Sequence, residues 1–120
     1  MTDHDDLVYL EHILECASLI QSYTINGKHE FMESTFVQDA VLRRLQIMAE
    51  STQRLSDDLK VKGPEVNWRA LSGFRNILVH DYLGGIDLER VWDAAKIYTP
   101  ELEVAVRELI VVVSNRKTSE

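Results

Sequence analysis

The sequence has few of the residues that stabilise small secreted or metal-bound folds. Cys16 is its single cysteine, which excludes a disulfide within the chain and a cysteine-based zinc site. No apolar run approaches the roughly 18 residues that a transmembrane helix needs. The first residues are acidic and lack the basic stretch of a secretory signal. We therefore expect a soluble, cytoplasmic protein that does not bind membranes.

Positive charge is also scarce. Lys and Arg number 13 against 20 Asp and Glu, a net charge of -7, so the surface as a whole repels a polyanion and any contact with nucleic acid must be local. The chain has 120 residues, 45% of them hydrophobic, which suits one domain with its own core. We expect a single helical domain over residues 1–120, with an ordered core at about 5–114 and a polar tail at 115–120.

The apolar residues recur at steps of three and four, which is typical of amphipathic helices. The pattern predicts five helices, over residues 5–24, about 35–62, 68–82, 88–98 and 100–114. No segment combines sustained alternation with turn signals at the spacing of strands. The sequence therefore predicts an all-α fold, an up-and-down bundle of about five helices.

Cap residues mark the expected starts of these helices. Thr35 with Gln38 has the spacing of a capping box, and Asn67 and Asp87 precede the third and fourth helices. Thr99 stands before a proline, the order expected for a cap followed by the first helical residue. These caps predict four separate helix starts.

The residues with the richest chemistry lie together in Arg75–Tyr82, just before a Gly-Gly pair. Arg75 offers a planar, permanent cation for phosphate, His80 can exchange a proton near neutral pH, and Tyr82 adds a hydroxyl. The segment has the components of a phosphate-directed site.

Helical geometry divides this segment. Arg75 and Tyr82 share one face, whereas Arg75 and His80 are about 140° apart around an ideal helix. Either the helix loosens near His80 or another chain completes the site. Cleavage of a phosphodiester by transfer to the 2′-hydroxyl needs both a proton donor and a proton acceptor. Two protomers that bring their His80 side chains together across a twofold axis would supply both, and the two Arg75 side chains would stabilise charge on phosphorus.

A structural interpretation stays open beside this one. A histidine at the polar end of a helix commonly interacts with the helix dipole, and Arg75 could pair with an acidic residue such as Glu50. In that case Arg75 is ion-paired in the core and His80 faces solvent alone.

The segment R-N-I-L-V-H-D-Y at Arg75–Tyr82 resembles the hallmark of the HepT family of prokaryotic HEPN-domain toxins: Arg, four residues, His, one residue, Tyr. The resemblance continues from Trp68 to Trp92, and it extends upstream to Gln38–Glu50 and Arg54–Leu59.

The resemblance implies a HEPN-like helical homodimer, the toxin of a type VII toxin-antitoxin system, that cleaves RNA as a metal-independent endoribonuclease without a cofactor. It assigns catalysis to Arg75 and His80 and a supporting polar role to Asn76. It also implies an MntA-like nucleotidyltransferase antitoxin that transfers AMP onto Tyr82. Phosphate on Tyr82 would bring negative charge to the face of Arg75 and silence the site.

The net charge leaves two alternatives. Arg75 could form a basic cleft with Arg43, Arg44 or Arg69, or the acidic surface could serve a basic antitoxin. A rival function is a non-catalytic helical adaptor that binds nucleotide or docks a nucleotidyltransferase. RNA cleavage by the purified protein separates the two.

Overall fold

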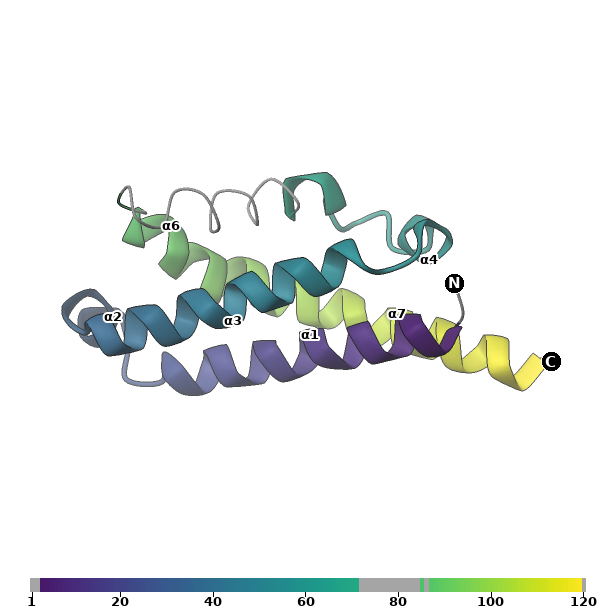
Figure 1. The fold of residues 1–120 in the computed structure, drawn as a ribbon, viewed down its shortest axis with the longest axis horizontal. Coiled ribbons are helices and arrows are strands. Elements are labelled where there is room, and N and C mark those ends of the chain that lie inside the picture. Colours follow the sequence, from purple (N-terminus) through teal and green to yellow (C-terminus); the bar gives the residue numbers. More distant parts are fainter. Residues whose placement is uncertain (1–2, 72–84, 86, 120) are drawn as a thin grey trace.

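Three long helices form the body of the protein. The computed structural model describes residues 3–71, 85 and 87–119. Figure 1 shows α1 (Asp3–Tyr23), α3 (Thr35–Gln53) and α7 (Thr99–Ser119) running along the long axis of the molecule. α1 packs against both α3 and α7.

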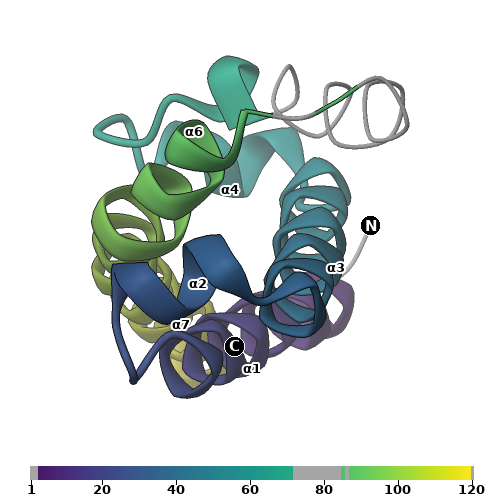
Figure 2. The same ribbon diagram turned by 90° about the vertical axis from the view of Figure 1, so that its left-hand side faces the viewer.

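Shorter elements connect these helices. They are α2 (Lys28–Glu33), α4 (Asp57–Val61), α6 (Leu88–Asp93) and the π-helical turn η2 (Ala94–Tyr98), and residues 68–71 form one further helical turn. The end-on view of Figure 2 shows how the helices surround a common interior. The described parts of the chain hold no strand, and the all-α prediction is confirmed.

The apolar faces that the sequence predicts meet in this interior. Leu10, Ile13 and Ile20 of α1 are fully buried, and Leu45 of α3 and Val106 of α7 pack into the same cluster. Each such side chain contributes about 1.5–3 kcal/mol when it leaves water. Burial of these faces is therefore the main force that holds the three long helices together.

The second predicted helix is wrong in its extent. The single helix expected over about 35–62 is divided, because α3 ends at Gln53 and α4 begins at Asp57. The Ser56 hydroxyl accepts from the backbone N–H of Leu59 and so caps α4. Ser56 in turn donates from its backbone N–H and its hydroxyl to the carboxylate of Asp6, at 2.8 and 2.7 Å. A partner from α1 thus fixes the break.

The predicted capping box is also wrong. Ser34, not Thr35, caps α3, and its hydroxyl accepts from the N–H of Val37 at 3.2 Å. The Gln38 side chain donates instead to the carbonyls of Phe31 and Met32 at the end of α2. These bonds tie α2 to α3.

Thr99 and Pro100 do not open a new helix. Thr99 has helical φ and ψ of -62° and -47°, and α6, η2 and α7 follow each other without a break. Proline lacks an N–H and its ring crowds the carbonyl four residues earlier, so the wider π turn of η2 accommodates Pro100 inside a continuous helix. The Thr99 hydroxyl donates to the Ala94 carbonyl at 2.7 Å and stabilises that turn. At its other end α7 extends to Ser119, beyond the expected end near residue 114.

Within the described ranges, no helix is both long enough and apolar enough to cross a membrane.

Candidate functional site

The four predicted site residues lie outside the described residues. Arg75, Asn76, His80 and Tyr82 all fall within 72–84, so their helical phase and the expected cleft between protomers stay predictions. The structure does describe the chain on both sides of this segment.

On the N-terminal side, two residues hold the chain in place. The Asn67 side chain accepts from the backbone N–H of Ala70 at 2.9 Å, which confirms the predicted cap. The Trp68 indole N–H donates to the Lys60 carbonyl of α4 at 3.1 Å and to the Gly63 carbonyl, just after that helix, at 3.2 Å. The turn that precedes the motif is therefore attached to α4.

On the C-terminal side, α6 begins at a side-chain cap. The Asp87 carboxylate accepts from the N–H of Glu89 at 3.0 Å, as predicted. Val91 of α6 is fully buried in the common core. The described residues before and after residues 72–84 are therefore both held by contacts with the rest of the fold.

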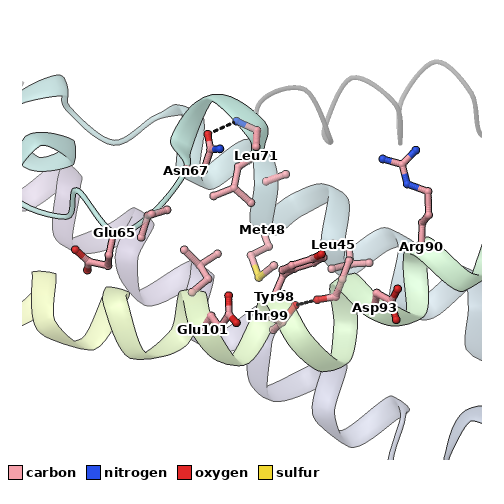
Figure 3. A pocket seen from close by; sticks show the side chains of 15 residues that line it. Leu45, Met48, Glu65, Asn67, Leu71, Arg90, Asp93, Tyr98, Thr99 and Glu101 are labelled. Carbon is pink, nitrogen blue, oxygen red and sulfur yellow. Dashed lines mark hydrogen bonds between the residues drawn. The ribbon is translucent and has the colours of Figure 1, made fainter.

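These two flanks form parts of the wall of one cavity of about 740 Å³ (Figure 3). The wall of the cavity includes residues 65–67, 70 and 71, which precede the motif, and Arg90 and Asp93, which follow it. α3, η2 and α7 supply the rest. The apolar lining residues are Leu45, Met48, Ala49, Val66, Ala70, Leu71, Ala94 and Leu102. A cavity of this size and lining is typical of ligand sites.

The charged groups around the cavity are mostly acidic. Arg90 is the one cation among the described lining residues, against the carboxylates of Glu65, Asp93 and Glu101. The Thr99 hydroxyl is occupied by its bond to a backbone carbonyl. The described lining residues include no histidine and no pair of nucleophile and base, so by themselves they provide walls and polarity and no catalytic set.

The arginines proposed for a basic cleft lie on two elements: Arg43 and Arg44 are neighbours on α3, and Arg69 lies in the turn at 68–71. Arg43 is exposed and donates to the Gln46 side chain at 3.2 Å, and Arg69 is exposed beside the Asn67 cap. Arg44 is half-buried against α1, where a hydrogen bond to the Tyr23 phenol raises the pKa of the guanidinium. Of the three, only Arg69 is close in sequence to the motif.

The acidic partner suggested for Arg75 has a described partner of its own. Glu50 accepts from the guanidinium of Arg54 at 3.4 Å, one turn along α3. Because Arg75 lies outside the described residues, its expected ion pair with Glu50 stays a prediction.

Two contacts between helices were not predicted. Tyr23 meets Arg44, and the Tyr9 ring lies 6.0 Å below the guanidinium carbon of Arg54. The sequence does indicate that the two tyrosines lie together, because Tyr9 and Tyr23 are 14 residues apart and therefore share one face of α1. Their partners on α3 depend on tertiary packing and leave no local signature.

Within the described ranges, no group of three or more His, Cys, Asp or Glu side chains lies close enough together to hold a metal ion.

The ribonuclease HepT-like family model matches residues 13–109. A Methanocaldococcus jannaschii protein named gamma-glutamylcyclotransferase and, provisionally, RNase is 32% identical over 96% of this chain, which spans 52% of that relative. A second protein of that organism, named provisionally as an RNase, is 33% identical over 88% of this chain and 97% of its own. A Thermococcus cleftensis protein named probable ribonuclease HepT is 34% identical over 79% of this chain and 86% of its own.

No solved structure is similar enough to this chain to count as a match. The family match is longer than half of the chain and contains the whole motif segment 75–82. The chain therefore belongs to the HepT-like ribonuclease family.

Proposed function

We propose that this protein is a metal-independent endoribonuclease, the toxin of a type VII toxin-antitoxin system. The observation that carries the proposal is the family match over residues 13–109, which includes the motif Arg75–Tyr82 intact. Ribonuclease appears in the names of relatives that match most of their own length. The helical fold agrees with this assignment.

Two residues carry the proposed chemistry. Arg75 places a permanent cation beside the scissile phosphate and stabilises the charge that develops there. His80 transfers a proton, as base to the attacking 2′-hydroxyl or as acid to the leaving oxygen. Asn76 supports the pair as a polar neighbour. None of these steps requires a metal ion or a cofactor.

The proposed catalyst is a homodimer. One His80 per chain supplies one proton-transfer group, whereas the reaction needs two. Two motif segments related by a twofold axis provide both histidines and both arginines.

Tyr82 is the proposed control point. A nucleotidyltransferase antitoxin would attach AMP to its hydroxyl, and the added phosphate would place negative charge on the helical face of Arg75. The modification would both compete for the cation and obstruct the approach of RNA.

The acidic rim of the cavity favours a second candidate. Glu65, Asp93 and Glu101 suit a basic partner better than RNA, as expected for a non-catalytic adaptor that docks a nucleotidyltransferase. This candidate predicts tight binding of that partner without any RNA cleavage.

The test is RNA cleavage by the purified protein in the presence of a chelator. Arg75→Ala and His80→Ala should each slow cleavage, the latter by roughly 10²- to 10⁴-fold, the usual contribution of a general acid or base. His29→Ala, at an exposed position of α2, is the matched control and should cleave like wild type. Equal rates for all four proteins would exclude the catalytic assignment.

A further inference from the structure

Three branched aliphatic side chains form a regular row on the outer surface of the last long helix and the turn before it. Ile97 of η2 and Val104 and Val111 of α7 follow each other at intervals of seven residues, and we call them the α7 row. Their exposed fractions are 49%, 60% and 57%. The apolar residues on the other side of α7 are buried: Leu102, Ala105, Val106, Leu109 and Val113. The helix therefore has an apolar core face and a second, exposed apolar line.

The spacing of the α7 row is that of a contact between helices. Seven residues are nearly two turns of an α-helix, so the three side chains lie on one line about 21 Å long. Single exposed aliphatic residues are common on protein surfaces, but a repeat of seven residues is how one helix presents a seam to another. Valine and isoleucine have few rotamers and lose little entropy when a partner covers them. The row therefore has the geometry of a docking surface for a helix.

Carboxylates lie along one edge of the α7 row. Glu101 follows Ile97 by four residues and Glu108 follows Val104 by four, so each lies next to a row member on the helix surface. Both glutamates are exposed, and neither has a partner among the described residues. Two negative charges are thus available beside the row.

The cations near the α7 row are engaged within the chain. Arg107 lies on the other edge and pairs with Glu103, one turn earlier, at 3.2 Å. The Lys96 amine donates to the Thr24 hydroxyl at 3.1 Å and lies 5.6 Å from the centre of the Trp92 ring. The charge that the row offers a partner is therefore negative, in keeping with the net charge of -7.

A second copy of the chain fits the α7 row poorly. A coiled coil between two α7 helices would also need apolar residues three positions after each member of the row. Pro100, Arg107 and Ser114 stand at those positions. The row therefore suits a helix of a different protein, one that supplies a wider apolar seam and the opposite charge.

We infer that the α7 row docks an amphipathic helix of a partner protein, which carries apolar residues along its seam and Lys or Arg on the flank that faces Glu101 and Glu108. Such a helix would cover Ile97, Val104 and Val111 and pair with both carboxylates. Glu101 also lines the cavity, so the docked helix would lie beside it (Figure 3). Docking on the row does not depend on RNA cleavage by the motif residues.

The test measures the binding of two designed peptides by fluorescence anisotropy. Each peptide is about three heptads long, with leucine along its seam and alanine at its outer positions to favour a helix. The positions that flank the seam carry lysine in one peptide and glutamate in the other. We expect the lysine peptide to bind wild type, more weakly as salt is added, and the glutamate peptide to bind at least about tenfold more weakly.

Two variants locate the contact. Val104→Asp places a charge in the middle of the α7 row and should weaken binding of the lysine peptide at least about tenfold. Glu101→Gln/Glu108→Gln should weaken it roughly fivefold in low salt and much less in high salt, because exposed ion pairs are screened. Circular dichroism verifies the fold of each variant.

The controls make the same changes elsewhere on the surface. Val61→Asp alters an exposed valine of α4, and Glu15→Gln/Glu33→Gln alters two exposed glutamates of α1 and α2. Both should bind the lysine peptide within about twofold of wild type at physiological salt, where distant charges are screened. If the controls lose as much affinity as the variants of the row, the inference fails.

Three further outcomes would overturn the inference. One is equal binding of the two peptides, which would mean that the carboxylates do not select the partner. Another is no binding of the lysine peptide at about 1 mM, the affinity of very weak contacts. The third is a wild-type dimer that binds no peptide and that Val104→Asp converts to monomers in light scattering, because a second copy would then cover the row.

Discussion

The carboxylate of Asp6 accepts two hydrogen bonds from Ser56, one from its backbone N–H at 2.8 Å and one from its hydroxyl at 2.7 Å. Asp6 is only 2% exposed, and the two residues are 50 positions apart. The pair joins the first turns of α1 to the start of α4. The Lys60 carbonyl of α4 and the Gly63 carbonyl just after it accept from the Trp68 indole, so a chain of contacts runs from the first turns of α1 to the turn before the motif.

Removing this carboxylate should destabilise the fold. Asp6→Ala leaves two donors of Ser56 without a partner, and hydrogen bonds to charged groups contribute about 1.5–3 kcal/mol each. We expect the free energy of unfolding in urea to fall by at least about 2 kcal/mol. Asp57→Ala, at an exposed position one residue after Ser56, should cost less than about 1 kcal/mol. Similar losses for both variants would show that the Asp6 contact contributes little.

Trp68 should affect activity as well as stability. Trp68→Phe keeps an aromatic ring and removes the indole N–H that reaches the carbonyls of Lys60 and Gly63, at a cost of about 0.5–1.5 kcal/mol. Because the turn at 68–71 precedes the motif, RNA cleavage should fall, by roughly 100-fold for a misplacement of about 1 Å. Trp92→Phe is the control, since Trp92 packs on Phe31 away from α4. Equal cleavage by the two variants would argue against a positioning role.

The π turn depends on the Thr99 hydroxyl. Thr99 is buried and donates to the Ala94 carbonyl at 2.7 Å, so Thr99→Val should lower the free energy of unfolding by about 1 kcal/mol. Thr99→Ser retains the hydroxyl and should lose less. The measurement is urea unfolding followed by circular dichroism. A more stable Val variant would mean that this hydrogen bond does not support η2.

Cys16 should be protected from alkylation by the fold. Burial raises the pKa of its thiol above the ordinary value of 9.0, although Arg44 opposes the shift. The unfolded chain then loses the proton at lower pH than the folded chain, so this residue makes the fold less stable as pH rises above about 9. Iodoacetamide should modify the protein slowly at pH 8 in buffer and rapidly in urea. Rapid modification of the folded protein would contradict this prediction.

Local chemistry explains which parts of the fold could be predicted. Asn67 and Asp87 cap helices as expected, because the interaction involves neighbours two or three residues away. The break between α3 and α4 has no such local signal, because Ser56 at the break bonds to Asp6, which lies on another helix. The capping box at Thr35 failed because Ser34, one residue earlier, offers the same chemistry and Gln38 bonds to α2.

The candidate site, too, can be predicted from the sequence only in part. Its motif can be read in the sequence as consecutive residues, Arg75–Tyr82, whereas the cavity combines side chains from both flanks of the motif with α3 and α7. The pairs Tyr9 with Arg54 and Tyr23 with Arg44 likewise arise only when α1 and α3 meet. Such contacts depend on packing between distant segments and have no local pattern.

The most direct test of the central claim is the rate of RNA cleavage by wild type and His80→Ala in chelator between pH 5 and 8. We expect a bell-shaped pH profile for wild type, because one group must donate a proton and another accept it. His80→Ala should be roughly 10²- to 10⁴-fold slower and should lose that profile. A His80→Ala protein that cleaves RNA at the wild-type rate with the same pH dependence would contradict the account.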